Sequence, residues 1–248
     1  MLAEIPTEEF VAALDDCVER LLWEAGIDRP PIDARAVAQH LGLIVVDHGS
    51  LTCRAQFVRL AANRRGGESH GTIAVGPAER PEREQWAIAH EVGESIAHDI
   101  FARLGVRPEC APANAREVVA NRLASCLLLP RRWFSVDGRG FDWDLLELKE
   151  RYSTASHELI ARRMLEMAPP IVITLCDQGR VIWRRGNAGC HPPRLLPEEH
   201  DAWQSTHVTG LQSDEALDPL TTGLGRVRSW PVHEPDWKRE IIRSEVAE

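Results

Sequence analysis

The sequence predicts an α+β fold, in which helices pack on a small mixed sheet and a β-rich extension follows. Three observations favour this class. Apolar residues recur at helical spacing in several long segments before residue 168. Short runs of β-branched and apolar residues follow the first two helical segments. Further runs of this kind dominate the last part of the chain. The chain has 248 residues, 44% of them hydrophobic, so it can bury a sizeable core.

The first elements alternate between helices and strands. An apolar series that includes Phe10 and Leu14 predicts a helix over residues 7–25, which Gly26 ends. Asp33 can cap a second, short helix through residue 39, because its carboxylate can accept a hydrogen bond from a free backbone N–H. Strands are then predicted over residues 43–46, 55–58 and 72–75.

The middle of the chain is predicted to be helical. Pro81 suits the first turn of a helix, and Gly105 suits the position just after its end. Further helices are predicted over residues 114–129, 142–150 and 155–167.

Pro169-Pro170 is the best domain boundary in the sequence. It divides the chain into residues 1–168 and a β-rich extension over residues 169–248. The segments IVITLC and RVIWRR flank Asp-Gln-Gly and predict a hairpin. A loop-rich stretch should follow, and then two strands, RVRSWPV and WKREIIRSEV.

Charge and cysteine usage narrow the functional class. The formal net charge is −9, which disfavours broad binding to nucleic acid or to anionic membranes. The six cysteines form no C-x-x-C pair, so we expect reduced thiols and a cytoplasmic protein. We also expect no signal peptide and no membrane span, because the N-terminus has no basic start and the apolar runs are short.

One short segment carries a metal-site pattern. Residues 90–94 read His-Glu-Val-Gly-Glu, which begins like the zinc-peptidase helix H-E-x-x-H. Residues four apart lie on one helical face, about 6 Å apart along the axis, so His90 and Glu94 can hold one ion. His90 and His98 lie roughly 12 Å apart along the axis and cannot hold the same ion. The rival half-site is Glu94 with His98. A plain amphipathic helix with solvated Glu91, Glu94 and His98 is the third interpretation.

A catalytic zinc usually takes three protein ligands, so the third must come from another element. Glu117, near the start of the following apolar helix, is a candidate; it is equally explained as a carboxylate that stabilises a helix N-terminus. Gly93 is unusual in a helix interior, where it costs about 1 kcal/mol relative to alanine. Its presence makes sense if another part of the chain passes close by.

Taken together, these segments resemble the ImmA/IrrE family of metallopeptidases over roughly residues 8 to 167. The likeness includes PPIDARAVAQHLGLIVV, the strand TIAV, WAIAHEVGES and EVVANRLASCLLLP, the last of which is similar to the family segment E-x-x-x-N-x-x-A-x-x-L-L-x-P. The resemblance implies a small zincin-like peptidase core. Glu94 stands where the family usually has the second histidine of H-E-x-x-H.

The resemblance assigns roles to four residues. His90, Glu94 and Glu117 would be the metal ligands, and Glu91, facing the open side of the site, would be the general base. Zinc is the expected metal; manganese or iron is also compatible, because carboxylate oxygens are harder ligands than imidazole. One histidine and two carboxylates neutralise a divalent ion, so it should acidify a water less than a site with two histidines.

The implied function is metal-dependent cleavage of a protein substrate in the cytoplasm. A helix-turn-helix repressor, cleaved in a stress or mobile-element response, is the substrate class that the family suggests. The alternative function is a non-catalytic binding or regulatory module that retains the peptidase fold.

Two further features of the helical segment bear on this function. Residues 141–167 resemble a helix-turn-helix, but their acidic residues outnumber the basic ones, so direct DNA binding is not expected. Tyr152 and His157 could supply an extra donor to a reaction intermediate, although a structural role suits them better.

Overall fold

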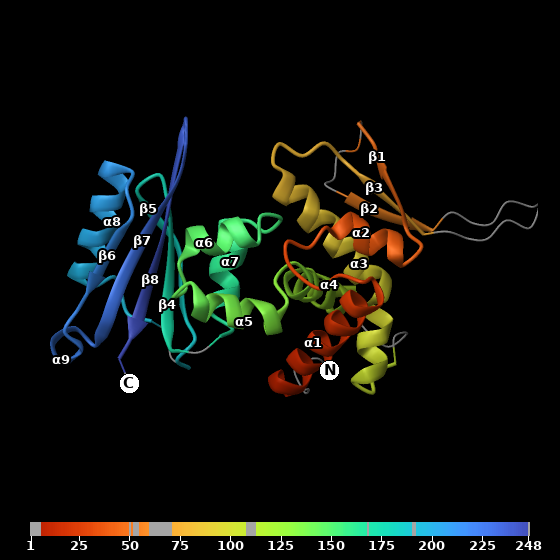
Figure 1. Ribbon diagram of the computed structural model, residues 1–248, viewed down its shortest axis with the longest axis horizontal. Helices are drawn as coiled ribbons and strands as arrows, with labels where there is room; N and C mark the ends of the chain where they lie inside the picture. The colour runs from red at the N-terminus through yellow and green to blue at the C-terminus, as the bar shows by residue number, and fades with distance from the viewer. Residues whose placement is uncertain are drawn as a thin grey trace, which may run out of the picture. The chain divides into compact units, whose positions relative to one another are not determined.

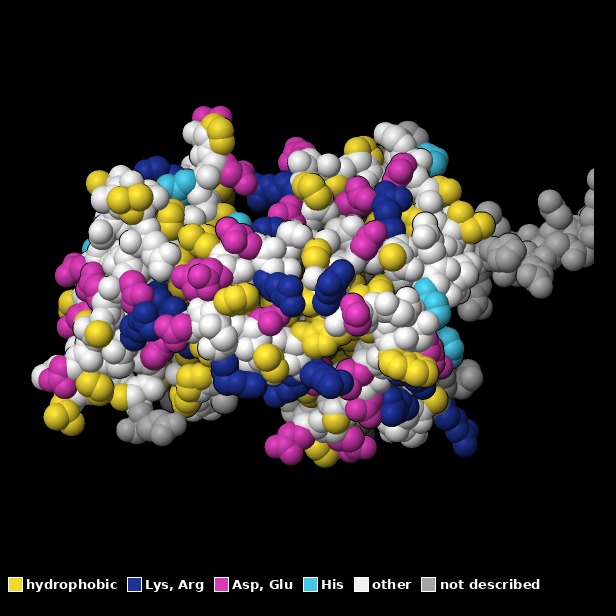
Figure 2. All heavy atoms as spheres, in the orientation of Figure 1, with side chains coloured by type: hydrophobic (Ala, Val, Ile, Leu, Met, Phe, Trp, Pro, Cys, Tyr) yellow, Lys and Arg dark blue, Asp and Glu magenta, His cyan; other side chains and the backbone are white. Residues whose placement is uncertain are grey.

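The computed structural model describes residues 6–49, 51, 55–59, 71–107, 113–167, 169–189 and 192–247. The α+β class is confirmed: helices accompany a small mixed sheet and a C-terminal antiparallel sheet (Figure 1). No helix in these ranges is both long and apolar enough to span a membrane. On the face shown in Figure 2, acidic and basic side chains are interspersed over the surface.

The chain folds into two compact units. The first comprises residues 1–140 and 150–156, and the second comprises residues 141–149 and 157–248. The helical segment at residues 141–167 therefore contributes to both. The division of the chain into residues 1–168 and 169–248 stays a prediction.

The first unit contains the small mixed sheet. Its order is β1-β3-β2, with β1 parallel and β2 antiparallel to β3, so β2 forms one edge. The strands are β1 (Ile44–Asp47), β2 (Ala55–Arg59) and β3 (Gly71–Val75). Ile73 and Val75 of β3 are buried, whereas Ile44 and Val46 of β1 are exposed, so only one face of the sheet is covered by helices.

Helices α1 (Thr7–Glu24) and α2 (Ala34–His40) precede this sheet, as predicted. The carboxylate of Asp33 accepts a hydrogen bond from the backbone N–H of Arg35, which confirms the expected cap of α2. The side chain of Gln85 in the next helix accepts a bond from the backbone N–H of Ala34 and thereby ties the start of α2 to that helix.

Two long helices form the centre of the first unit. Helix α3 (Pro81–Arg103) packs against β2, β3 and α2, and α4 (Ala113–Leu128) packs against α3 and α1. Both were predicted to within two residues at each end. Helix α5 (Arg131–Gly140) was not predicted; Pro130 ends the preceding helical pattern and lies directly before α5. Proline also suits the residue at which a helix begins, and α5 starts directly after it.

The second unit is built on a five-stranded antiparallel sheet of order β5-β4-β8-β7-β6. The predicted hairpin is confirmed: β4 and β5 are joined by Gln178 and Gly179, whose φ angles are +49° and +73°. Such left-handed backbone suits two-residue hairpin loops. The two predicted C-terminal strands are also confirmed. The strands are β4 (Ile171–Asp177), β5 (Arg180–Gly186), β6 (Ser213–Ala216), β7 (Leu224–Glu234) and β8 (Trp237–Val246).

Helices lie on both faces of this sheet. Glu158 of α7 (His157–Met164) accepts hydrogen bonds from Trp183 and Arg239, and Asp144, just before α6 (Leu145–Arg151), accepts one from Trp230. On the other face, α8 (Pro197–Thr209) packs against β6, β7 and β8.

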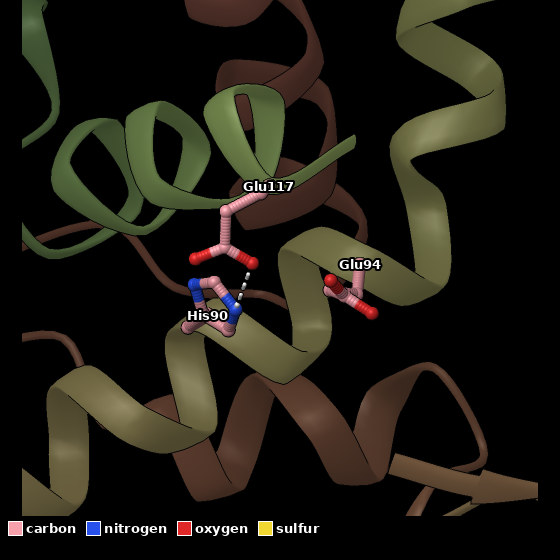
Figure 3. Close-up of side chains that lie close together, drawn as sticks. All are labelled: His90, Glu94 and Glu117. Atoms are coloured by element: carbon pink, nitrogen blue, oxygen red, sulfur yellow. Dashed lines mark ion pairs between the residues drawn. The ribbon is translucent and has the colours of Figure 1, made fainter. Parts of the chain in front are cut away.

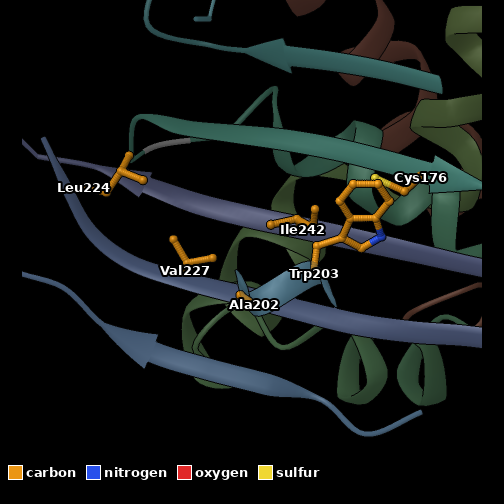
Figure 4. Close-up of a cluster of buried hydrophobic side chains, with 6 residues drawn as sticks. All are labelled: Cys176, Ala202, Trp203, Leu224, Val227 and Ile242. Atoms are coloured by element: carbon orange, nitrogen blue, oxygen red, sulfur yellow. The ribbon is translucent and has the colours of Figure 1, made fainter. Parts of the chain in front are cut away.

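The expectation of a loop-rich stretch after the hairpin is wrong, because helix α8, strand β6 and the short helix α9 (Pro219–Thr222) lie there. The face of α8 that meets the sheet mixes apolar and polar residues, so its periodicity is weak in the sequence. Trp203 packs in the apolar cluster drawn in Figure 4 and donates to the buried carboxylate of Glu240 at 3.0 Å. Fully buried Glu199 accepts from Arg184 at 2.8 Å.

Three of the six cysteines lie in the described part of the chain. Cys17, Cys126 and Cys176 are buried, and none of these three forms a disulfide. The other three, Cys53, Cys110 and Cys190, lie outside the described residues.

Candidate metal centre

The candidate centre lies beside a close approach of α3 and α4. A Cβ added to Gly93 would lie 2.9 Å from both the Cα and the carbonyl oxygen of Ala120. Ordinary contacts of a Cβ begin at 3.4 Å, so any other residue at position 93 would force the helices apart. This confirms the expectation that the mid-helix glycine permits a close approach, and it places the residues next to Ala120 beside those next to Gly93.

Three side chains meet beside this crossing. His90 and Glu94 extend from consecutive turns of α3, and Glu117 extends toward them from α4 (Figure 3). One potential ligand atom of each lies within 4.8 Å of the other two. The His90 Nε2 atom is 3.6 Å from Oε2 of Glu117. The structure therefore brings together the three residues that the sequence pointed to.

Exposure differs among the three side chains. That of His90 is 17% exposed, whereas that of Glu117 is 56% exposed and Glu94 is also exposed. The group is thus anchored on the protein side by the imidazole and open to solvent on the side of the two carboxylates. Such an arrangement leaves room for a ligand from solution.

Asn121, one turn after Glu117, links the two helices at this point. Its Oδ1 lies 3.2 Å from Nδ1 of His90, and its Nδ2 donates to Oε1 of Glu117 at 2.9 Å. The sequence contained a hint of this residue, because it is the asparagine of the E-x-x-x-N segment. Its contacts could not be read from that pattern.

Glu91 departs from one expectation. We expected it to face the open side of the site, but its residue exposure is only 9%, and its Oε2 accepts a hydrogen bond from the backbone N–H of Phe57 in β2 at 2.8 Å. Because β2 is an edge strand, this N–H is not needed by the sheet and can point at α3. Packing α3 against β2 thus buries the carboxylate that the plain amphipathic-helix interpretation placed in solvent.

The surroundings of Glu91 shift its pKa upward. Burial raises the pKa of Glu91 above its ordinary value, and the negative charges of Glu94 and Glu117 raise it further. His90 and the Phe57 N–H act in the opposite direction. A carboxyl group whose pKa is raised toward neutrality is suited to exchanging protons.

The donor set fits a divalent metal. One imidazole and two carboxylates are accepted ligands of zinc, and three protein ligands with an open position are typical of catalytic rather than structural zinc sites. The carboxylates also suit manganese or iron. The exposed side of the group can provide the open position.

The remaining candidates lie elsewhere. His98 is 60% exposed and contacts Asp99, and it is not part of the group within the described ranges. Tyr152 is fully buried and donates its hydroxyl to Asp137 at 2.8 Å, which is the structural role that suited it better. His157 begins α7 in the second unit.

Comparison with known families agrees with this geometry. Residues 47–165, which contain all of these site residues, match the family model of the IrrE N-terminal-like domain, Peptidase_M78. This part of the chain is similar to IrrE N-terminal-like domains. The resemblance noted in the sequence is thereby confirmed, and the His-Glu-Glu group lies inside the segment that matches this peptidase-family model.

Among solved structures, a "Mycobacterium tuberculosis transcriptional regulator" is similar to this chain, with a TM-score of 0.64 and 18% sequence identity. The match covers 94% of this chain and 75% of the regulator's chain. At this identity the match shows that the fold is shared, also outside residues 47–165, and no more. No curated protein matches the chain.

Proposed function

We propose that the chain is a metal-dependent endopeptidase that acts on a protein substrate in the cytoplasm. The observation that carries the proposal is the convergence of His90, Glu94 and Glu117 within 4.8 Å, inside a peptidase-family domain. Zinc is the first metal to test, followed by manganese and iron. Glu94, in place of histidine, makes the ligand set richer in oxygen and neutralises a divalent ion.

His90, Glu94 and Glu117 would hold the ion, and Glu91 would act as general base. Bound there, a zinc ion would lower the pKa of a water and polarise the peptide carbonyl. Glu91 would take a proton from the attacking water and deliver it to the leaving amine. The Phe57 N–H already holds Oε2 of Glu91, so that Oε1 is the oxygen left for this proton.

Glu94 should weaken this chemistry without abolishing it. Two carboxylates and one imidazole cancel the charge of a divalent ion, so the ion withdraws less electron density from a water or a carbonyl. We therefore propose a slow peptidase, suited to a regulatory cut in one protein rather than to general digestion. Helix-turn-helix repressors, in a stress or mobile-element response, are the first substrate class to test.

The test uses metal-loaded protein and a peptide library prepared from a cytoplasmic proteome, with new termini detected by mass spectrometry. Wild-type protein should produce cleavages that Glu91→Gln does not, because the amide cannot accept the water's proton. Glu91→Gln should nevertheless retain its metal. His98→Ala, a change in an exposed histidine of the same helix, is the matched control and should cleave like wild type.

The alternative function, a non-catalytic binding or regulatory module, predicts a different outcome. In that case wild type and Glu91→Gln would give the same peptides, whether or not metal is bound. If His90→Ala loses the metal and wild type cleaves no peptide, a metal-stabilised binding domain is the better account.

A further inference from the structure

The side chain of Asn121 contacts both a ring nitrogen of His90 and the carboxylate of Glu117. The two contacts use opposite ends of its side-chain amide, at 3.2 Å and 2.9 Å. Asn121 is partly buried and follows Ala120, the residue that meets Gly93. Its position is thus set by the tight crossing of α3 and α4 and not by its own side chain alone.

The chemistry of the three groups fixes the direction of each bond. An ionised carboxylate can only accept, so the end of the amide that faces Glu117 must be the NH₂ group. The end that faces His90 must then be the oxygen, which can only accept. Nδ1 of His90 must therefore carry a proton, and in a neutral imidazole the other nitrogen, Nε2, is left with a free lone pair.

Nε2 is the nitrogen that faces the carboxylate of Glu117, at 3.6 Å from Oε2. The lone pair is thus on the side of the ring from which a metal would be held. The same amide restrains Glu117 through Oε1 and leaves Oε2 directed toward the imidazole. A single asparagine orients two of the three candidate ligands at once.

We infer that Asn121 is a positioning residue that fixes His90 in its Nδ1–H tautomer and holds Glu117, so that both present their free atoms to one metal ion. This inference rests on the proposed metal site. Groups that hydrogen-bond to metal ligands in this way typically change metal affinity by about 10- to 100-fold when they are removed. Asn121 would affect the reaction only through His90 and Glu117.

A purely structural role makes a different prediction. If Asn121 served only to tie α4 to α3, its removal would lower stability and would leave the tautomer of His90 and the intrinsic zinc affinity unchanged. Two variants separate the roles. Asn121→Leu removes both hydrogen bonds, whereas Asn121→Asp keeps an acceptor for His90 Nδ1 and loses the donor to Glu117. Asn114→Leu, at an exposed asparagine of the same helix, is the matched control.

The first measurement is the protonation of the two ring nitrogens of His90 in metal-free protein. It uses long-range ¹H–¹⁵N spectra of protein labelled in its histidines, at a pH about two units above the ordinary imidazole pKa of about 6.5. The His90 signals are assigned by their loss in His90→Ala. Wild type, Asn121→Asp and Asn114→Leu should carry the proton on Nδ1, and Asn121→Leu should lose this preference.

The second measurement is zinc affinity, by competition with a chelator of known affinity. Asn121→Leu should bind zinc about 10- to 100-fold more weakly than wild type, and Asn114→Leu should bind within about twofold. A wild-type His90 protonated on Nε2, or an Asn121→Leu variant with unchanged zinc affinity, overturns the inference. Failure of the proposed metal site is distinguishable, because wild type would then bind no zinc while the tautomer in metal-free protein still reports on Asn121.

Discussion

The close contact between Gly93 and Ala120 leads to a quantitative prediction for Gly93→Ala. An added methyl group would meet backbone atoms of Ala120 at 2.9 Å, about half an ångström inside the 3.4 Å at which ordinary contact begins. Backbone cannot rotate away as a flexible side chain can, so α4 must shift. Overpacking of this kind costs about 1–3 kcal/mol, and the better helix propensity of alanine returns about 1 kcal/mol. We therefore expect a net loss of up to about 2 kcal/mol.

The assay is urea denaturation followed by circular dichroism, with amide hydrogen exchange of α3 and α4 as a reading specific to the first unit. Gly140→Ala is the matched control, because this glycine also lies in a helix but an added Cβ would have nothing within 4 Å. It should leave stability unchanged or raise it by up to about 1 kcal/mol. Zinc binding by Gly93→Ala should weaken as well, since the shift moves Glu117 and Asn121 away from His90.

A stabilised Gly93→Ala variant would refute this reasoning. If Gly93→Ala and Gly140→Ala both gained stability, Gly93 would be an ordinary helix-destabilising residue. The crossing of α3 and α4 would then be looser than the structure indicates. Faster exchange in α3 and α4, with unchanged exchange in the second unit, is the pattern expected from a local separation of the two helices.

Two further predictions concern the second unit. Trp203→Phe removes the donor to the buried carboxylate of Glu240 and should destabilise this unit by about 1–3 kcal/mol in urea denaturation. The control variant Trp237→Phe, at a side chain that is 42% exposed, should change stability little. Equal effects of the two variants would contradict the role of the hydrogen bond between Trp203 and Glu240. Burial raises the pKa of Cys176 from 9.0 to about 12, so its alkylation at pH 8 should be slow until the protein is unfolded. Rapid alkylation of Cys176 in the native protein would contradict its burial. Because the pKa of this thiol is higher in the folded than in the unfolded protein, its contribution to stability should be complete below pH 9 and lost as pH rises toward about 12.

Much of the first unit could be predicted from the sequence, for physical reasons that hold locally. The limits of α3 follow from Pro81 and Gly105, and the expected close neighbour of Gly93 follows from the cost of glycine within a helix. The His90 and Glu94 pair follows from the helical repeat, which brings residues four apart to one face.

The parts that could not be predicted depend on contacts between distant segments. The burial of Glu91 depends on the edge position of β2, which places the Phe57 N–H against α3. Helix α8 depends on buried polar partners such as Glu199 and Glu240, which no periodicity of apolar residues reveals. The contact of Asn121 with His90 depends on the helix crossing, although the four-residue spacing from Glu117 already placed it on the same face of α4.

The most direct test of the metal centre is the zinc content of three proteins purified without chelator: wild type, Glu94→Ala and Glu94→His. Elemental analysis gives zinc per chain for each. We predict the highest content in Glu94→His, because a second imidazole joins His90 at the correct spacing, an intermediate content in wild type, and the lowest in Glu94→Ala. Equal zinc in all three proteins, or none in any of them, would contradict the assignment of Glu94 as a ligand.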